Sequence, residues 1–153
     1  MAKVVKDTPL AELTLRKYEK PFNLAGRALI KKLCLSLGVL QQGDSRDVVV
    51  DVFHVLLNVR KQKKMLTSEE VRLAVIALRE TEKLPLLGVA GSNIRRHLGR
   101  LRELFLVEKI KNHYCIAEFL TLTELFDEKI ERFLLHSLKE RVRDYLAEVD
   151  AQL

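Results

Sequence analysis

The chain has 153 residues, of which 48% are hydrophobic and 31% are charged, so it can bury a core and is not of the intrinsically disordered class. Its formal charge of +6 suggests a polyanionic partner, and the excess lies in the first 64 residues and in residues 92–120. With six glycines, three prolines and no tryptophan, the composition favours helix over sheet. We therefore expect a mainly α-helical protein.

The two cysteines, Cys34 and Cys115, lie in apolar patterns and belong to no CxxC pair, so we expect core thiols rather than a disulfide or zinc site. No apolar run approaches the ~20 residues that span a bilayer, and the first residues lack the apolar stretch of a signal peptide. The sequence therefore predicts a cytoplasmic protein without a membrane partner.

The first half of the chain is predicted to contain an arm and two helices. Residues 1–23 show no sustained period and contain Lys20-Pro21, so we expect an arm that packs on a neighbour. Residues 24–46 are predicted to form a supporting helix, stopped by Gly38, and a turn. The valine-rich run from residue 47 to 64 is predicted to be a buried helix, because it follows capping residues and ends in a basic turn.

The middle of the chain is predicted to contain two further helices. Thr67 and Glu70 have the spacing of a capping box, which predicts a helix that continues to about Glu80. After a break at residues 84–91, Ser92 is predicted to cap the next helix. The apolar residues of that helix recur at spacings of 4, 3 and 4: Ile94, Leu98, Leu101 and Phe105.

After residue 105 the apolar period changes to two. Residues 106–110 and 114–119 are typical of two short strands around a polar turn, which predicts a hairpin. From Thr123 a helical pattern runs almost to the end, and its apolar seam is typical of a helix that pairs with another helix. We expect residues 120–153 to form a homodimerisation arm, with packing on the chain's own helix at 24–37 as the alternative. The seam residues are Leu135, Leu138, Val142, Tyr145 and Val149.

The predicted order of three helices and a hairpin over residues 47–119 resembles the winged helix-turn-helix superfamily of archaeal and bacterial regulators. The run from Ser92 to Lys109, SNIRRHLGRLRELFLVEK, is similar to the reading helix and first wing strand of MarR-, ArsR- and PadR-like repressors. The resemblance implies a mainly α fold with a small β-hairpin wing, duplex DNA binding and transcription regulation, with the whole chain as one compact unit.

Two features depart from this family's pattern. Phe105 stands where such repressors usually have a glycine that leaves the reading helix in a left-handed conformation. A phenylalanine would be strained there, so we expect this helix to end differently. The connection before the reading helix is also long, about eleven residues instead of a short turn.

When its apolar residues face inward, the helix at 92–104 places Arg96 and Arg100 on its opposite face and Arg95 and Arg102 on one flank. Arginine reads guanine and asparagine reads adenine in the major groove, while flanking cations contact phosphates. We expect Asn93, Arg96 and Arg100 at base edges, with Arg95 and Arg102 at phosphates. The predicted DNA-contacting set is Ser92, Asn93, Arg95, Arg96, Gly99, Arg100, Arg102, Lys109, Lys111 and His113.

Gly99 and the hairpin turn complete this predicted interface. Gly99 would let the backbone approach the bases, although a glycine inside a helix can also relieve a packing clash or be neutral. Lys109, Lys111 and His113 would lie along phosphates or in the minor groove. A second basic cluster at 60–64 is explained as well by its place at a helix end.

Enzymatic motifs are absent from the sequence: there is no Gly-rich phosphate loop, no HExxH and no GxSxG. The four histidines lack metal-ligand spacing, and His54 is expected to be a core histidine with its hydrogen bonds satisfied. We therefore expect no catalysis, cofactor or metal, and no small-molecule ligand is evident. The alternatives to DNA binding are a protein-docking module in a replication, chromosome or transcription complex and an RNA or replication-fork binder.

Overall fold

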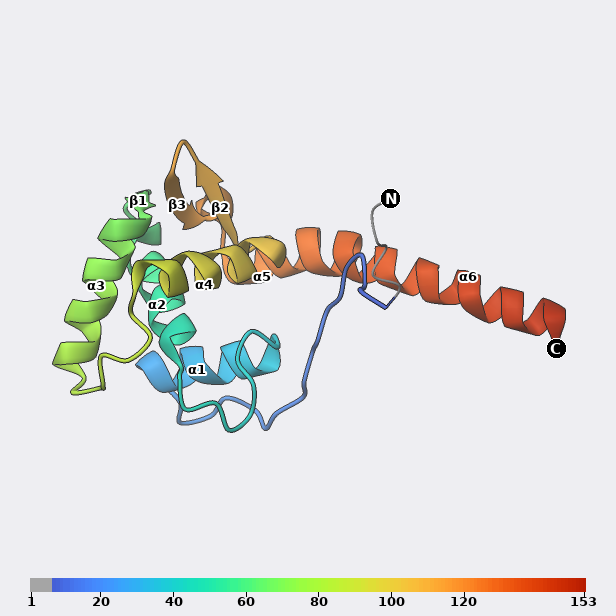
Figure 1. Cartoon of the computed structure of the whole chain (residues 1–153), viewed down its shortest axis with the longest axis horizontal. Coiled ribbons are helices and arrows are strands. Elements are labelled where there is room, and N and C mark those ends of the chain that lie inside the picture. The colour runs from blue at the N-terminus through green and yellow to red at the C-terminus, as the bar shows by residue number, and fades with distance from the viewer. Residues whose placement is uncertain (1–6) are drawn as a thin grey trace.

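The computed structural model describes residues 7–153, so the first six residues of the expected N-terminal arm lie outside the described part. It shows a mainly helical protein with a small three-stranded antiparallel sheet, which confirms the expected α-rich fold with a β-hairpin (Figure 1). The main elements are α1 (Gly26–Ser36), α2 (Val48–Arg60), β1 (Leu66–Thr67), α3 (Ser68–Thr81), α4 (Gly91–Glu103), β2 (Val107–Ile110), β3 (His113–Ile116), α5 (Leu122–Leu125) and α6 (His136–Gln152).

Helix α2 is the centre of the core. Its valine run is helical, as predicted, and the residues from Val48 to Phe53 are buried together with Val55 and Leu56. It contacts α1, α3, α4 and β3, so apolar side chains on every side of α2 meet another element. Contact with neighbours all around the helix explains why β-branched valines form a helix here against their preference for strands.

Helix α3 begins with the predicted capping box. The Glu70 backbone N–H donates to the Thr67 hydroxyl over 3.1 Å, and the Thr67 N–H donates to the Glu70 carboxylate over 2.9 Å. The two residues before it, Leu66 and Thr67, form β1, a strand too short to be predicted from the sequence. β1 pairs with β3, so the strand order is β1-β3-β2.

The predicted hairpin is present, with a shorter second strand than expected. Its two-residue turn, Lys111-Asn112, has φ angles of 49° and 64°, which match the turns that follow the twist of a hairpin. Residues 117–119 form a 3₁₀ turn instead of extending β3 to Phe119. The alternation in the sequence predicted a strand there, but Glu118 and Phe119 adopt left-handed φ angles of 52° and 54°, which end it.

Helices α1 and α4 both end in left-handed residues that the sequence analysis considered. Gly38 follows α1 with a φ of 72° and acts as the predicted stop. Phe105 follows α4 with a φ of 60°, so our expectation that α4 would end differently was wrong. The N–H groups of Phe105 and Leu106 donate to the carbonyls of Arg102 and Leu101, and the Phe105 ring packs edge-on against Phe133, with centroids 5.6 Å apart. These contacts offset the steric cost of a left-handed phenylalanine.

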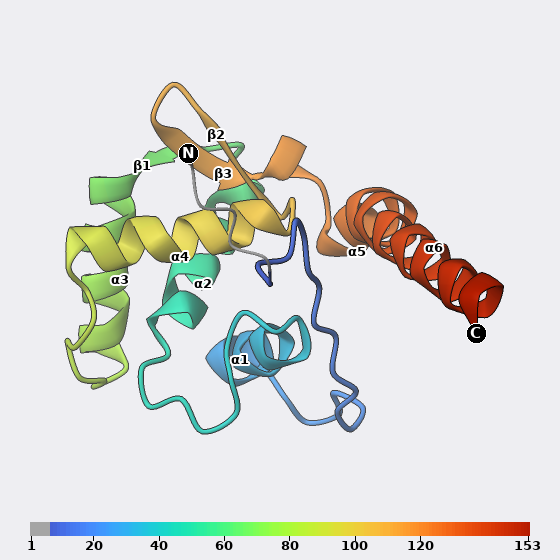
Figure 2. The same ribbon diagram turned by 45° about the vertical axis from the view of Figure 1, so that its right-hand side comes forward.

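The last part of the chain is one continuous helix from Leu122 to Gln152, in which a wider π-helical stretch over residues 126–135 joins α5 to α6. It begins one residue earlier than expected, because Thr121 and Glu124 form a second capping box. Ile130 and Leu134 in the π-helical stretch are buried, whereas every residue of α6 is partly or fully exposed. α6 extends away from the body of the molecule (Figure 2).

The N-terminal arm packs on α1 of its own chain. The Arg16 guanidinium donates to the carbonyls of Leu35 and Leu40 over 2.9 and 3.3 Å, and Lys32 pairs with Glu19 over 2.7 Å. A Cβ atom at Gly38 would lie only 2.7 Å from the Thr14 Cβ, so the arm depends on that glycine for its close approach. Among the described residues, no helix is both long and apolar enough to cross a membrane.

Candidate functional site

Helix α4 separates a fully buried face from a basic one. Ile94, Leu98 and Leu101 are each 0% exposed, which confirms the predicted inward face. The helix begins at Gly91 after Ala90, so Ser92 lies in the first turn and is not the cap that the sequence predicted. Ser92 keeps an exposed position at the start of the helix.

Three of the four α4 arginines are exposed. Within residues 7–153, no carboxylate oxygen lies within 4.0 Å of the guanidinium nitrogens of Arg95, Arg96 or Arg102. We define these three residues as the open arginine face. Their charges are therefore uncompensated by any direct acidic partner in the described chain.

Asn93 and Arg100 are placed differently from the prediction. Both are half-buried, and the Arg100 guanidinium donates to the Gly38 carbonyl over 3.2 Å. Arg100 is thus less open to solvent or a ligand than the sequence predicted, because the loop after α1 covers this side of α4. Asn93 and Arg100 face that loop together with Arg96.

Gly99 lies on α4 where a side chain would meet empty space. A Cβ atom built there has no described neighbour within 4 Å, so Gly99 does not relieve a packing clash. A glycine inside a helix costs about 0.5–1 kcal/mol relative to alanine. No close contact in the described chain that requires a glycine offsets this cost. The remaining interpretations are close approach of another molecule and neutrality.

Six of the ten predicted site residues line two hollows along α4. The first lies between α4 and β2 and brings Gly99, Arg102 and Lys109 together with Glu103 and Glu108. The second lies between α4 and the loop after α1, where Asn93, Arg96 and Arg100 line a pocket of about 200 Å³. Arg95 and Ser92 lie outside both hollows.

His97 lies in the second hollow. Its Nδ1 atom is buried and has no hydrogen-bond partner in the described part of the chain. Burial, reinforced by the charges of Arg96 and Arg100, lowers the pKa of His97 to about 4. The ring is therefore neutral at physiological pH, able to accept at one nitrogen and to donate at the other.

The tip of the hairpin carries the remaining predicted residues. Lys109, Lys111 and His113 are all exposed. The Lys109 ammonium lies 5.6 Å from the centre of the Tyr114 ring, and His113 Nδ1 lies 2.8 Å from the Lys111 carbonyl oxygen. These contacts leave the two lysine charges accessible at one end of the sheet.

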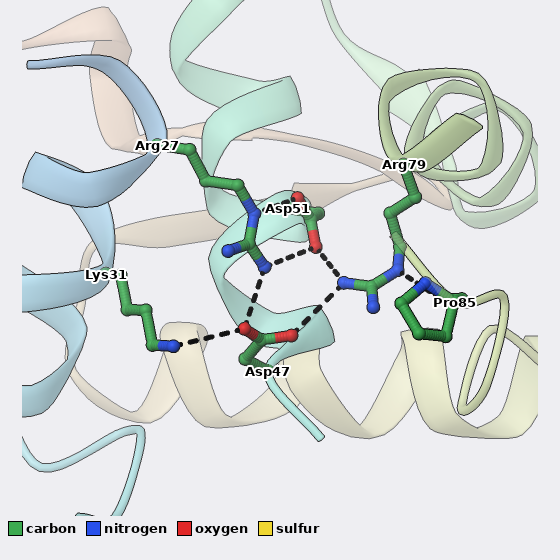
Figure 3. Close-up of polar contacts among 6 residues, drawn as sticks. All are labelled: Arg27, Lys31, Asp47, Asp51, Arg79 and Pro85. Carbon is green, nitrogen blue, oxygen red and sulfur yellow. Dashed lines mark hydrogen bonds and ion pairs between the residues drawn. The ribbon is translucent and has the colours of Figure 1, made fainter. Parts of the chain in front are cut away.

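A buried ion cluster, which the sequence analysis did not find, ties three elements together (Figure 3). Asp47 and Asp51 at the start of α2 lie between Arg27 of α1 and Arg79 of α3. Asp51 is 0% and Arg79 is 3% exposed, and their charged groups are 2.6 Å apart. The available signal was Asp51 itself, an acidic residue among valines, since a buried carboxylate needs a cationic partner.

Further contacts complete this cluster. Arg27 Nε donates to Asp51 over 2.9 Å and its Nη2 lies 3.0 Å from Asp47, which also pairs with Lys31 over 3.4 Å. Burial raises the pKa of Asp47, but hydrogen bonding to Arg27 and Arg79 and the nearby positive charges outweigh it and lower the pKa. These polar groups are mutually satisfied, which indicates a structural role.

Arg79 of this cluster and Arg72, both on α3, hold the long connection between α3 and α4 in place. Arg79 Nε donates to the Pro85 carbonyl over 2.8 Å (Figure 3). Arg72 Nε donates to the Val89 carbonyl over 3.0 Å. Residues 82–90 are thus fixed to α3 by two arginines. These bonds hold the nine-residue loop, which has no regular secondary structure, so that α4 begins at a defined position.

Cys34 and Cys115 are buried, as predicted, at 0% and 1% exposure. Burial raises the pKa of each thiol to about 12, which keeps both protonated and unreactive at neutral pH. His54 differs from the prediction, because its Nδ1 is buried without a hydrogen-bond partner among the described residues.

The predicted seam of the C-terminal helix is exposed over most of its length. Leu135 and Leu138 are half-buried and line an open groove with Leu13 and Leu15 of the arm. The rest of the seam and its neighbour Leu146 are between 53% and 70% exposed: Val142, Tyr145, Leu146 and Val149.

Comparisons with protein-family models, curated proteins and solved structures gave no match for this chain.

Proposed function

We propose that this protein binds duplex DNA through the open arginine face of α4 and the adjacent β2–β3 hairpin, as a transcription regulator with a winged helix-turn-helix at residues 47–119. The observation that carries this proposal is the open arginine face: Arg96 lies opposite a completely buried face, Arg95 and Arg102 lie on its flank, and all three are exposed and lack acidic partners in residues 7–153. Unpaired guanidinium groups on one helix face suit phosphate oxygens and guanine edges.

The arrangement of elements supports the proposal. The order α2-β1-α3-α4-β2-β3, with strand order β1-β3-β2, is compatible with a winged helix. The hairpin follows α4 directly and places Lys109 beside Gly99 and Arg102 in one hollow. An α4 helix inserted in a major groove would bring these groups close to the DNA backbone, and Gly99 would offer bare helix surface for close approach.

Binding to duplex DNA of random sequence, measured by fluorescence anisotropy across a salt titration, tests this proposal. We expect the logarithm of the binding constant to fall steeply with the logarithm of salt concentration, because phosphate contacts release counterions. No measurable binding at low salt would contradict DNA binding and favour a protein-docking role. Tighter binding to single-stranded RNA or to forked DNA than to duplex DNA would favour the other alternative.

We also propose that α6 pairs with α6 of a second copy in antiparallel orientation. Its apolar residues are exposed to solvent, with Val142 at 57% and Val149 at 53% exposure, and a partner helix would bury them. Its charges divide by position: residues 136–143 carry three cations and one acid, and residues 144–153 carry three acids and no cation. Antiparallel pairing about a two-fold axis places each basic half against an acidic half.

Sedimentation equilibrium of two charge-reversed variants tests this pairing. The doubly substituted Lys139→Glu, Arg143→Glu chain makes both halves of α6 net negative, and the Asp144→Lys, Glu148→Lys chain makes both halves net positive. Each variant alone should be monomeric at concentrations where the unchanged protein is dimeric, and their mixture should restore the dimer. A mixture that remains monomeric, or an unchanged protein that is monomeric, would contradict the pairing.

A further inference from the structure

The hollow between α4 and the loop after α1 is strongly cationic. Three guanidinium groups line it: Arg96 and Arg100 from α4 and Arg46 from the loop. Among residues 7–153, Asp44 is its only acidic lining residue, and that carboxylate already accepts the Gln41 backbone N–H over 3.0 Å. Like charges gathered in one hollow repel one another, so an anion placed among them would be stabilised.

These three arginines lack the compensation that Arg27 and Arg79 have in the buried cluster. Within residues 7–153, none of the three has a carboxylate oxygen within 4.0 Å of its guanidinium nitrogens. Arg100 makes one hydrogen bond, to the Gly38 carbonyl over 3.2 Å, which fixes its position and leaves other N–H groups available. The hollow therefore holds one positioned guanidinium, that of Arg100, and two further charged donors, without an acceptor of matching charge in residues 7–153.

The walls of this hollow provide neutral polar groups and an apolar floor. Asn93 and His97 line it from α4, and His97 carries a buried Nδ1 without a hydrogen-bond partner in the described chain. Val39, Leu40, Val48 and Val49 form its apolar lining. A volume of about 200 Å³ accommodates one tetrahedral anion and a small apolar body.

We propose that this hollow is a phosphate-binding pocket, in which Arg46, Arg96 and Arg100 hold a phosphate group with Asn93 and His97 as neutral hydrogen-bond partners. Arginine forks match phosphate oxygens in bidentate geometry, and a half-enclosed site strengthens such bonds. The phosphate group belongs either to a small phosphorylated molecule or to the DNA backbone, because both present the same oxygens. Binding of a free phosphate does not rest on the proposed function in DNA binding.

A consequence follows for Arg96, which is exposed on the open arginine face and also lines the pocket. A small phosphorylated ligand would draw its guanidinium into the pocket and withdraw it from DNA. If the protein binds DNA as proposed, phosphate in the pocket should weaken that binding beyond the effect of ionic strength alone.

Nuclear magnetic resonance titration at constant ionic strength tests the pocket directly, with inorganic phosphate and phenyl phosphate as probes. We expect saturable shifts in the signals of Asn93, His97 and Arg100 and of the loop at 41–48. The variant Arg46→Gln should weaken phosphate binding about tenfold or more, because one charged hydrogen-bond partner is lost. Arg46 makes no hydrogen bond or ion pair within residues 7–153, so this substitution should leave folding intact.

The matched control is Arg102→Gln, which removes the same charge from α4 but outside the pocket and should leave phosphate affinity nearly unchanged. If phosphate gives no saturable shift but short duplex DNA shifts the same pocket signals, and Arg46→Gln removes those shifts, the phosphate comes from the DNA backbone. The proposal is overturned if none of the probes shifts the pocket signals saturably. It is also overturned if Arg46→Gln and Arg102→Gln weaken the binding of inorganic phosphate and phenyl phosphate equally. Such a failure would leave DNA binding by the open arginine face to be judged by its own titration.

Discussion

The arginines of the buried ion cluster and those of the open arginine face are the same side chain in opposite circumstances. Arg27 and Arg79 flank Asp47 and Asp51, which neutralise their charges within the core. Arg95, Arg96 and Arg102 lie on an exposed surface without a carboxylate within 4.0 Å in residues 7–153. The role of each arginine therefore depends on whether other elements place an acidic side chain beside it. The first set should stabilise the fold, and the second should be free to bind a polyanion.

Removing Arg79 should disrupt the buried ion cluster and lower the stability of the fold. Arg79→Ala leaves Asp51 buried with one cation fewer, so the free energy of unfolding should fall by about 3–5 kcal/mol, as for other broken buried ion pairs. Urea denaturation measures this loss. Arg95→Ala is the control and should change stability by less than about 0.5 kcal/mol. A loss below about 1 kcal/mol for Arg79→Ala would show that the cluster does not hold α1 and α3 to α2.

Removing Arg96 should weaken DNA binding and leave stability unchanged, which is the reverse of what is expected for Arg79. Arg96→Ala should weaken duplex DNA binding by about 1–3 kcal/mol, because a guanidinium contact to a base or phosphate is lost, and should leave unfolding by urea nearly unchanged. Anisotropy titration at one fixed salt concentration measures the affinity. Unchanged affinity would place the DNA interface away from this part of α4.

Acid should destabilise the protein through His97, which lines the hollow beside Arg96 and Arg100. The pKa of His97 is lowered to about 4 by burial and by Arg96 and Arg100, with Arg46 and Asp44 lining the same hollow. The unfolded chain takes up a proton near pH 6.5, whereas the folded chain does so only near pH 4. The free energy of unfolding should therefore decrease as the pH falls from 6.5 to 4.

The size of this effect should be about 2 kcal/mol, less than for a fully desolvated ring because His97 is only half-buried. Urea denaturation of the protein and of His97→Gln between pH 4 and 7, in buffers without phosphate, measures it. The variant should lose less stability across this window. Parallel pH profiles for the two proteins would show that His97 is not the group responsible.

Gly99 gives the smallest effect and separates stability from binding most cleanly. Gly99→Ala should raise the free energy of unfolding by about 0.5–1 kcal/mol, because the added methyl group meets open space and alanine favours helix. If bare backbone at this position approaches the DNA, the same change should weaken DNA binding. A gain in stability with unchanged DNA affinity would indicate that this glycine is neutral for function.

Local features of the fold were predictable from the sequence because neighbouring residues determine them. The capping box at Thr67 and Glu70, the stop at Gly38 and the buried face of α4 all follow from spacing within one element. The end of α4 was wrongly predicted, since the contact that favours a left-handed Phe105 comes from Phe133, far along the chain.

The candidate site was predictable only in part, for the same reason. Helical periodicity placed Arg95, Arg96 and Arg102 outward, but periodicity carries no information about the loop that covers Asn93 and Arg100. The buried ion cluster was missed because it requires α1, α2 and α3 to meet at one point. Such meetings are set by tertiary packing, which spacing within a segment does not describe.

The most direct test of DNA binding by the open arginine face compares two triple variants with the same change in net charge. Arg95→Gln, Arg96→Gln, Arg102→Gln removes the open arginine face, and Lys17→Gln, Lys20→Gln, Lys83→Gln removes three exposed cations on other segments. The measurement is the salt dependence of duplex DNA binding. Our account predicts that the arginine variant reduces the slope of log affinity against log salt by about 2–3, since each lost phosphate contact contributes about 0.9, while the lysine variant leaves it nearly unchanged. Equal slopes for the two variants would contradict it.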